Sequence, residues 1–313
     1  MKVWTVIVIT ILWAVSCNQV NDLNPVDPGT DPTEAVKVVK SRFPNAKDLV
    51  FKTIMSSKVW EVGFNLEADK YTSLVDQTKM WETFRSNADT VPALLQDLMP
   101  GSVFIGGVFS DNAEDIDFYP TSERRHRLIY KFNNTDYSFD WRRYQGTNYR
   151  PTNATFELIK YHIPISKMED FPEEIRTYMA GKKELTLVGG EARVMLNYEK
   201  QYWMQVFVKR NNQDYVGFLI FDEKGNLRWM SQDFTDNATN LETLPKAIQR
   251  ELDRSPELQG FKYMSPQYDR YKGEYDGKLS YYLKLTSPSY SQVCELYFDQ
   301  EGNLLNKRYF VSF

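Results

Sequence analysis

The chain of 313 residues is poor in histidine and cysteine, the residue types that most often bind zinc. Its only histidines are His126 and His162, and its only cysteines are Cys17 and Cys294. A structural or catalytic zinc ion needs three or four ligands at workable spacing, and these four residues do not supply them. We therefore expect no metal site. We expect structural roles for both histidines, with His126 in a solvated, charged loop.

The sequence signatures of common enzyme classes are also missing. The chain has no Gly-x-Ser-x-Gly motif, and Gly106-Gly107 and Gly189-Gly190 lack the lysine of a phosphate-binding loop. The acidic run Asp111–Asp117 lacks the ligand register of an EF-hand, so we expect a solvated, negatively charged loop there. We predict a protein that is not an enzyme and binds no cofactor.

Strong charge of one sign and long apolar runs are absent from the body of the chain. The net charge is −4 and the charges are mixed along the sequence, without the basic stripe typical of nucleic-acid binding. No apolar run after residue 15 approaches the roughly 18 residues of a membrane-spanning helix. Nucleic acid is therefore not an expected partner.

The N-terminus has the layout of a secretory signal peptide. Lys2 precedes the apolar stretch Val3–Val15, and small residues then lead to Cys17. The placement of Cys17 resembles the lipobox of bacterial lipoproteins, although Ala14 stands where leucine is usual. The resemblance implies a signal peptide at residues 1–17 that ends at a lipidated Cys17, through which the chain meets a membrane. An ordinary signal peptide with a chance cysteine is the alternative.

The segment that follows predicts a tether. Residues 18–31 are rich in Asn, Asp, Pro and Gly and offer little to bury, so we expect a flexible linker. With Cys17 lipidated, Cys294 has no partner for an intramolecular disulfide, and we predict a small buried residue on a strand. This plan predicts an exported protein, lipid-anchored in the bacterial cell envelope, in the periplasm or at the cell surface.

A seven-residue phrase occurs twice, at residues 221–227 and 298–304, which lie 77 positions apart. Both copies read Phe-Asp, two variable residues, then Gly-Asn-Leu, and both follow an apolar run. Asp and Gly at these positions suit the turn of a β-hairpin. Self-similarity at a fixed period predicts a repeated structural unit.

Prolines at four positions predict the first turns of short helices, because proline fits where the N–H has no helical partner. They are Pro32, Pro92, Pro172 and Pro245. Aromatic residues make up 15% of the chain, and alternating runs rich in them predict strands after each helix. In the run 202–208, Trp203 and Phe207 fall on one side of the predicted strand. The predicted fold class is α+β, built from tandem repeats of a helix and an antiparallel sheet.

The repeats predict two domains, residues 32–166 and residues 167–313, each with two copies of the helix-plus-sheet pattern. The second copy is the poorest. It contains a plausible hairpin, Leu128–Phe132 and Tyr137–Trp141, but the additional apolar run Ala154–Ile165 has no counterpart in the others. The architecture of residues 100–165 is the least determined part of this prediction.

These motifs resemble the PepSY-like domains of exported bacterial proteins, which are similar to the β-lactamase inhibitor protein fold. The resemblance depends on the Leu-Pro helix start, the repeated phrase and Phe43-Pro44-Asn45-Ala46, which looks like the Phe-Pro-x-Ala sequence common there. It covers most of residues 32–313. It implies tandem α+β units without catalytic residues, and binding or inhibition of another protein as a known use of the fold.

Tyrosines crowd the last part of the chain and offer rigid, amphipathic rings for recognition on an open sheet face. The candidate binding-face residues are Tyr268, Tyr271, Tyr281, Tyr282 and Trp203. The alternative is that such rings fill a core between two stacked repeats. We predict a noncatalytic, lipid-anchored binding protein that recognises a protein, a peptide or an envelope polymer.

Two alternatives stay open. The first is an inhibitor or regulator of an envelope enzyme, similar to the β-lactamase inhibitor, with a protruding loop at residues 110–127 that plugs a catalytic cleft. The second and weaker one is an uncharacterised hydrolase. A deep pocket with convergent carboxylates and a shifted pKa would favour the hydrolase.

Overall fold

The structure is a computed structural model, and its chain divides into two compact units. Unit 1 comprises Met1–Glu67 and Ser73–Trp81, and unit 2 comprises Ala68–Thr72 and Glu82–Phe313. The predicted boundary between residues 166 and 167 falls inside unit 2. The residues that the structure describes are 32–55, 58–86, 106–117, 123–144, 151–210, 213–231, 236–237, 244–258, 261–263, 270–275, 277–287 and 292–312.

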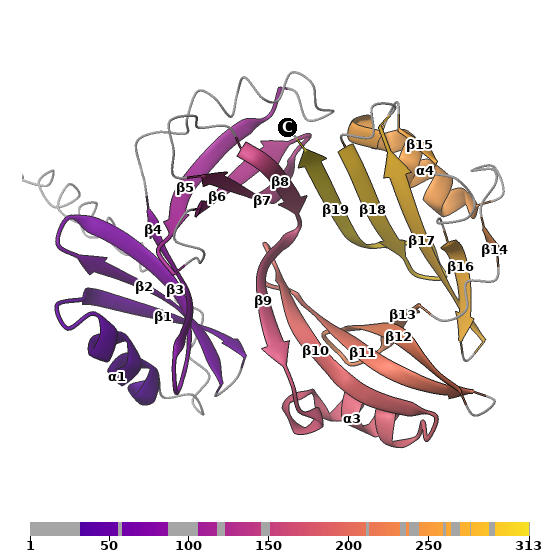
Figure 1. Cartoon of the computed structure of the whole chain (residues 1–313), viewed down its shortest axis with the longest axis horizontal. Helices are drawn as coiled ribbons and strands as arrows, with labels where there is room; N and C mark the ends of the chain where they lie inside the picture. Colours follow the sequence, from indigo (N-terminus) through magenta and orange to yellow (C-terminus); the bar gives the residue numbers. More distant parts are fainter. Residues whose placement is uncertain are drawn as a thin grey trace, which may run out of the picture. The chain divides into compact units, whose positions relative to one another are not determined.

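Unit 1 packs one helix against a small antiparallel sheet (Figure 1). The helix α1 (Thr33–Arg42) buries Ala35 and Val39. The strands β1 (Lys47–Met55) and β2 (Val59–Leu66) pair antiparallel, and β3 (Asp69–Asp76) and β4 (Met80–Ser86) contain residues of both units. Apolar side chains of the strands, including a nearly fully buried Trp60, complete a core of its own.

Unit 2 contains a long antiparallel sheet. Its hydrogen-bonded order, starting from β4, is β5, β6, β7, β8, β19, β18, β17, β16 and β14, and β15 pairs with β17. The first four of these strands are β5 (Val108–Asp115), β6 (Glu123–Phe132), β7 (Thr135–Tyr144) and β8 (Pro151–Glu157). The later ones are β14 (Asp236–Asn237), β15 (Lys262–Tyr263), β16 (Arg270–Tyr275), β17 (Lys278–Thr286), β18 (Gln292–Phe298) and β19 (Leu304–Ser312).

The helix α4 (Lys246–Arg254) and the short 3-10 helix η4 (Pro256–Leu258) cover this sheet near β17 (Figure 1). Ile248 and Leu252 of α4 join one apolar core with the rings of β6, β7 and β8 and with the inward residues of β17, β18 and β19. Cys294 of β18 is fully buried in this core, which confirms the prediction of a small buried residue.

Unit 2 also contains a five-stranded antiparallel sheet in the order β13, β12, β11, β10, β9. Its strands are β9 (Ile159–Ile165), β10 (Leu185–Met195), β11 (Lys200–Arg210), β12 (Gln213–Asp222) and β13 (Leu227–Met230). The 3-10 helix η2 (Met168–Asp170) and the helix α3 (Glu173–Ala180) follow β9, and α3 covers one face of this sheet (Figure 1). There Ile175 is buried and Tyr178 packs edge-on against Phe221.

The two sheets of unit 2 pack against each other through aromatic side chains. Trp203, Ile220 and Trp229 of the five-stranded sheet form one cluster with Tyr282, Tyr297 and Leu305 of the long sheet. The Trp229 indole N–H donates to the Tyr281 carbonyl oxygen at 3.0 Å. The face of the five-stranded sheet that lies away from α3 is therefore partly covered by the long sheet.

Local predictions from the sequence agree with this fold where the structure describes it. Helices begin directly after Pro32, Pro172 and Pro245, and each proline carbonyl accepts the first helical hydrogen bond. The predicted helix after Pro92 lies outside the described residues. Both copies of the repeated phrase form turns, with φ of +78° at Gly225 and +81° at Gly302. The hairpin 128–141 is formed by β6 and β7.

The predicted fold class, tandem helix-plus-sheet repeats, is wrong. The structure is 62% strand and 16% helix, with three α-helices in the part described, and antiparallel sheet dominates it. The strands of different predicted repeats join in one sheet, because β8 pairs with β19 from Ala154 opposite Val311 to Glu157 opposite Arg308. The helices are short, at 8 to 10 residues, and each covers only part of a sheet face.

No helix within the described ranges has both the length and the apolar character needed to cross a bilayer.

Candidate binding site

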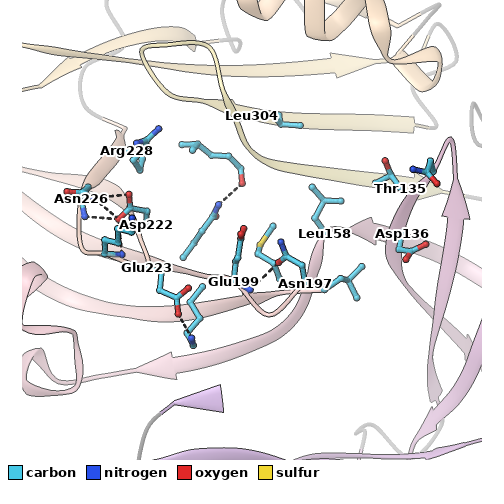
Figure 2. Close-up of a pocket in the computed structure, with 17 residues that line it drawn as sticks. Thr135, Asp136, Leu158, Asn197, Glu199, Asp222, Glu223, Asn226, Arg228 and Leu304 are labelled. Carbon is cyan, nitrogen blue, oxygen red and sulfur yellow. Dashed lines mark hydrogen bonds and ion pairs between the residues drawn. The ribbon is translucent and has the colours of Figure 1, made fainter. Parts of the chain in front are cut away.

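Three hairpin turns of unit 2 surround a cavity of about 880 Å³ (Figure 2). One wall is the β6–β7 turn with Thr135 and Asp136, and another is the β10–β11 turn with Asn197 and Glu199. The β12–β13 turn closes a third side, and leucine side chains, among them Leu158, supply apolar surface. The cavity is large enough for a small ligand, since ligand pockets typically measure about 300 to 1,000 Å³.

Several polar groups of the cavity wall already serve the fold. The Asp222 carboxylate accepts hydrogen bonds from the backbone N–H groups of Lys224, at 3.0 Å, and Asn226, at 2.9 Å, and so fixes the β12–β13 turn. The Gln201 amide donates to the Leu305 carbonyl oxygen at 2.7 Å, and Lys200 forms an ion pair with Glu223. The wall is therefore a rigid, mixed-charge surface without a convergent set of catalytic groups.

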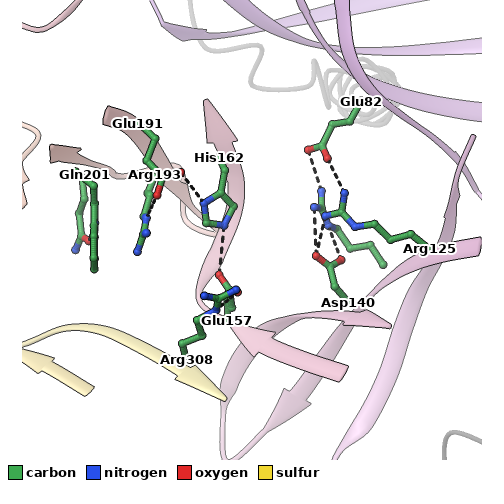
Figure 3. Close-up of polar contacts among 11 residues, drawn as sticks. Glu82, Arg125, Asp140, Glu157, His162, Glu191, Arg193, Gln201 and Arg308 are labelled. Carbon is green, nitrogen blue, oxygen red and sulfur yellow. Dashed lines mark hydrogen bonds and ion pairs between the residues drawn. The ribbon is translucent and has the colours of Figure 1, made fainter. Parts of the chain in front are cut away.

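Two arginines of β6 form a compact ion network with carboxylates of neighbouring strands (Figure 3). The guanidinium of Arg125 lies 2.9 Å from Asp140, 3.2 Å from Asp115 and 3.3 Å from Glu82. Arg127 lies 3.0 Å from Asp140 and 3.3 Å from Glu82. Burial by itself raises the pKa of Asp140, but the two arginines outweigh it and lower the pKa to about 2. The Asp140 carboxylate is therefore ionised at neutral pH and pairs with both arginines.

A second chain of alternating charges links the two sheets of unit 2 through His162 on β9 (Figure 3). The Arg308 Nε lies 2.6 Å from Glu157, and the two ring nitrogens of His162 lie 3.3 Å from Glu157 and 3.3 Å from Glu191. Burial lowers the pKa of His162, but both carboxylates oppose it and the pKa is raised overall. Burial raises the pKa of Glu191, while His162 and Arg193 outweigh it and lower the pKa to about 2.

These networks correct two predictions about solvated loops. His126 is not in a loop: it lies on β6, is 4% exposed and stacks on Trp141 with ring centroids 4.7 Å apart. The acidic run Asp111–Asp117 lies largely on β5, where Asp115 is buried against Arg125. Stacking on Trp141 allows His126 to be buried, and the opposite charge of Arg125 on the neighbouring strand allows the burial of Asp115.

The proposed cleft-plugging loop, residues 110–127, is likewise mostly sheet in the part described. Residues 110–115 belong to β5 and residues 123–127 to β6, and these strands pair with Ala113 opposite Arg127. Both ends of the predicted loop are thus held in a ladder, and Arg125 and Arg127 take part in the ion network.

The face of the five-stranded sheet away from α3 carries three exposed apolar side chains that are not among the predicted binding-face residues. Phe207 on β11 is 43% exposed, and Val216 and Phe218 on β12 are 52% and 42% exposed. Phe207 lies directly opposite Val216 in the ladder. The alternation of β11 placed Phe207 beside Trp203, but sequence alone does not tell which part of that face the long sheet covers.

Three of the predicted binding-face rings are buried or partly buried. Trp203 and Tyr282 belong to the packing between the two sheets, which agrees with the alternative of a core between stacked repeats. The Tyr281 ring lies on the other face of the long sheet, in the core that α4 covers. Tyr268 and Cys17 are outside the described part of the chain. Tyr271 lies on β16, but its side chain is outside the described part. Within the described ranges, no three His, Cys, Asp or Glu side chains gather to hold one metal ion.

No model of a known protein family matches this chain, and no curated protein matches it either.

Proposed function

We propose that this protein is a noncatalytic, lipid-anchored binding protein of the bacterial cell envelope. It recognises a protein, a peptide or an envelope polymer through an open sheet face. The observation that carries this proposal is the uncovered apolar part of the five-stranded sheet, with Phe207, Val216 and Phe218 exposed side by side. Contiguous exposed apolar side chains are typical of interaction sites, because isolated soluble surfaces rarely keep them.

The locations of the two carboxylates with strongly lowered pKa values favour a role without catalysis. The carboxylates with strongly lowered pKa values, Asp140 and Glu191, are each paired with arginine. Neither lines the cavity of about 880 Å³. Catalytic acids and bases need a pKa suited to proton transfer and access to substrate. Carboxylates that are paired with arginine and ionised at neutral pH instead stabilise the sheets.

The anchor and the location are proposed from the N-terminal sequence. A lipidated Cys17 followed by the tether 18–31 places the folded units at a membrane surface, in the periplasm or outside the cell. Each buried methylene of an acyl chain contributes about 0.8 kcal/mol, so several chains hold such a protein firmly. The resemblance to PepSY-like domains agrees with a binding role and is part of the proposal.

The test uses the soluble chain from Asn21 to Phe313 and two defined probes, insoluble cell-wall polymer and a phage-displayed random peptide library. We expect saturable binding to at least one probe, and a loss of at least tenfold in the double variant Phe207→Ser/Phe218→Ser. The control is Val50→Ser, which removes an apolar side chain that is even more exposed (57%) from β1 in unit 1. Equal binding by both variants, or turnover of a hydrolase substrate, would reject the proposal.

A further inference from the structure

The strand β12 is paired unevenly along its two edges. On one side it pairs with β11 along its whole length, from Gln213 opposite Arg210 to Asp222 opposite Gln201. On the other side β13 pairs only with Leu219–Phe221. No strand of the described part pairs with Gln213–Phe218 on that side. The outer half of β12 is therefore an edge.

The hydrogen bonds of Phe218 show which backbone groups face this edge. Its N–H donates to the Ser231 hydroxyl at 2.8 Å, and its carbonyl oxygen accepts from the Ser231 N–H at 2.8 Å. In an antiparallel strand, the N–H and C=O of one residue point to the same side, and every second residue repeats that direction. The N–H and C=O groups of Val216 and Asp214 therefore point to the edge, away from β11.

The side chains at the edge offer both apolar contact and a charge. Val216 and Phe218 lie on the sheet face that carries Phe207, and all three are more than 40% exposed. The same face continues into the cluster of Trp203, Ile220 and Trp229, which the long sheet covers. An added strand would extend this existing packing. Asp214, which is also exposed and lies opposite Lys209 of β11, places a carboxylate at the outer end of the edge.

We propose that the edge of β12, residues 214–218, takes up an extended peptide segment of a partner protein as an additional strand. This inference rests on the proposed binding function and names the chemistry of the partner. Main-chain hydrogen bonds to Val216 and Asp214 supply affinity, and side-chain contacts supply specificity, as in other cases of strand addition. The segment carries an apolar residue beside Val216 and a lysine or arginine beside Asp214.

A second copy of this chain fits the edge less well. Two β12 edges could pair antiparallel through Val216 or Asp214 in three registers. These registers place the Asp214 carboxylate beside Val216, beside Phe218 or beside the other Asp214. The first two pairings set a charge against an apolar side chain, and the third sets like charges opposite each other, which is destabilising. Charge complementarity thus favours a segment of different sequence.

The central test is Val216→Pro in the soluble chain from Asn21 to Phe313. Proline removes the N–H that faces the edge but no hydrogen bond to β11, and edge strands tolerate it at such positions. The probe is a fluorescent, acetylated peptide of sequence KTVTVTK, which places its lysines and valines on one face of the strand and is measured by anisotropy up to 1 mM. We expect saturable binding that Val216→Pro weakens at least tenfold. Val216→Thr keeps the N–H and is expected to weaken it only two- to fourfold.

Two further measurements keep the test independent of how well the proline variant folds. Exchange of both lysines for glutamate in the peptide is expected to abolish binding, and Asp214→Lys is expected to restore it. A peptide with N-methyl groups on its edge-facing amides is expected not to bind. The inference is overturned if the wild-type chain does not bind KTVTVTK, or if Val216→Pro or N-methylation has no effect.

Other outcomes separate this inference from the proposed function. Loss of cell-wall polymer or library binding in Phe207→Ser/Phe218→Ser, without any effect of Val216→Pro, would retain the sheet-face function and reject strand addition. A dimer seen by sedimentation velocity without peptide, and abolished by Val216→Pro, would assign the edge to a second copy instead.

Discussion

At the residue scale, unit 2 buries arginines by surrounding them with carboxylates from other strands. Arg127 is only 12% exposed, and Asp140 and Glu82 hold its guanidinium from two sides. An unpaired charge at this position would be costly, because transfer of an ion from water is repaid only by well-placed partners. The network is therefore expected to behave as one unit, in which loss of a shared carboxylate removes an ion pair from both arginines.

We predict that Asp140→Asn lowers the free energy of unfolding by about 2 kcal/mol at pH 7, because Arg125 and Arg127 both lose an ion pair and keep only Glu82 as a shared partner. The lowered pKa of Asp140 contributes stability above the ordinary value of 3.8, which is lost as the pH falls toward about 2. Urea unfolding at pH 7 and pH 3 measures both effects. Glu34→Gln in the exposed pair with Lys37 is the control and should change stability by less than about 0.5 kcal/mol.

A second prediction at this scale concerns the pH dependence of His162. Its raised pKa means that the ion pairs with Glu157 and Glu191 stabilise the fold fully below the ordinary value of 6.5 and are lost as the pH rises through the folded-state pKa. An NMR titration of the imidazole should give a pKa above 6.5, and Glu191→Gln should lower it. A wild-type pKa at or below 6.5 would contradict the assignment.

At the element scale, the two copies of the repeated phrase form turns that pack against the first turns of α3 and α4. A Cβ atom at Gly225 would lie 2.4 Å from the Glu174 Cβ on α3, and one at Gly302 would lie 2.7 Å from the Ala247 Cβ on α4. Both glycines also have positive φ, which other residues adopt only at a cost. Glycine is therefore needed at each position for two reasons, the positive φ and the short distance to the helix.

We predict that Gly225→Ala and Gly302→Ala each lower the free energy of unfolding by about 2 to 3 kcal/mol, as the strain of positive φ adds to the clash. Gly277→Ala is the matched control, because Gly277 has φ of +69° but no atom within 4 Å of the added Cβ. It should cost only about 1 kcal/mol. Equal losses at all three positions in urea unfolding would show that contact with the helix contributes nothing.

At the scale of the whole molecule, the proposed attachment to the membrane depends on one residue, Cys17. We predict that Cys17→Ser moves the protein from the membrane fraction to the soluble fraction of cells, because no acyl chains then anchor it. Immunoblotting of separated fractions measures this. Cys294→Ala, which changes the other cysteine, should leave the protein with the membranes. Continued membrane association of Cys17→Ser would contradict lipid anchoring.

The sequence by itself determined the features that neighbouring residues control. Pro32, Pro172 and Pro245 each precede a helix, and the turns at Gly225 and Gly302 follow from their own chemistry. The burial of Cys294 follows from the alternation of its strand. These features need only local backbone preferences and a hydrophobic period, so a single sequence contains the information.

Only the tertiary structure decided what depends on residues far apart in the chain. The pairing of β8 with β19 joins positions such as Ala154 and Val311, so strands from different predicted repeats belong to one dominant sheet. The same long-range packing buried Trp203 and Tyr281, paired Arg127 with Asp140, and left Phe207 and Val216 exposed. Alternation in a strand tells which side chains share a face, but coverage of that face is set by whichever distant strand packs there.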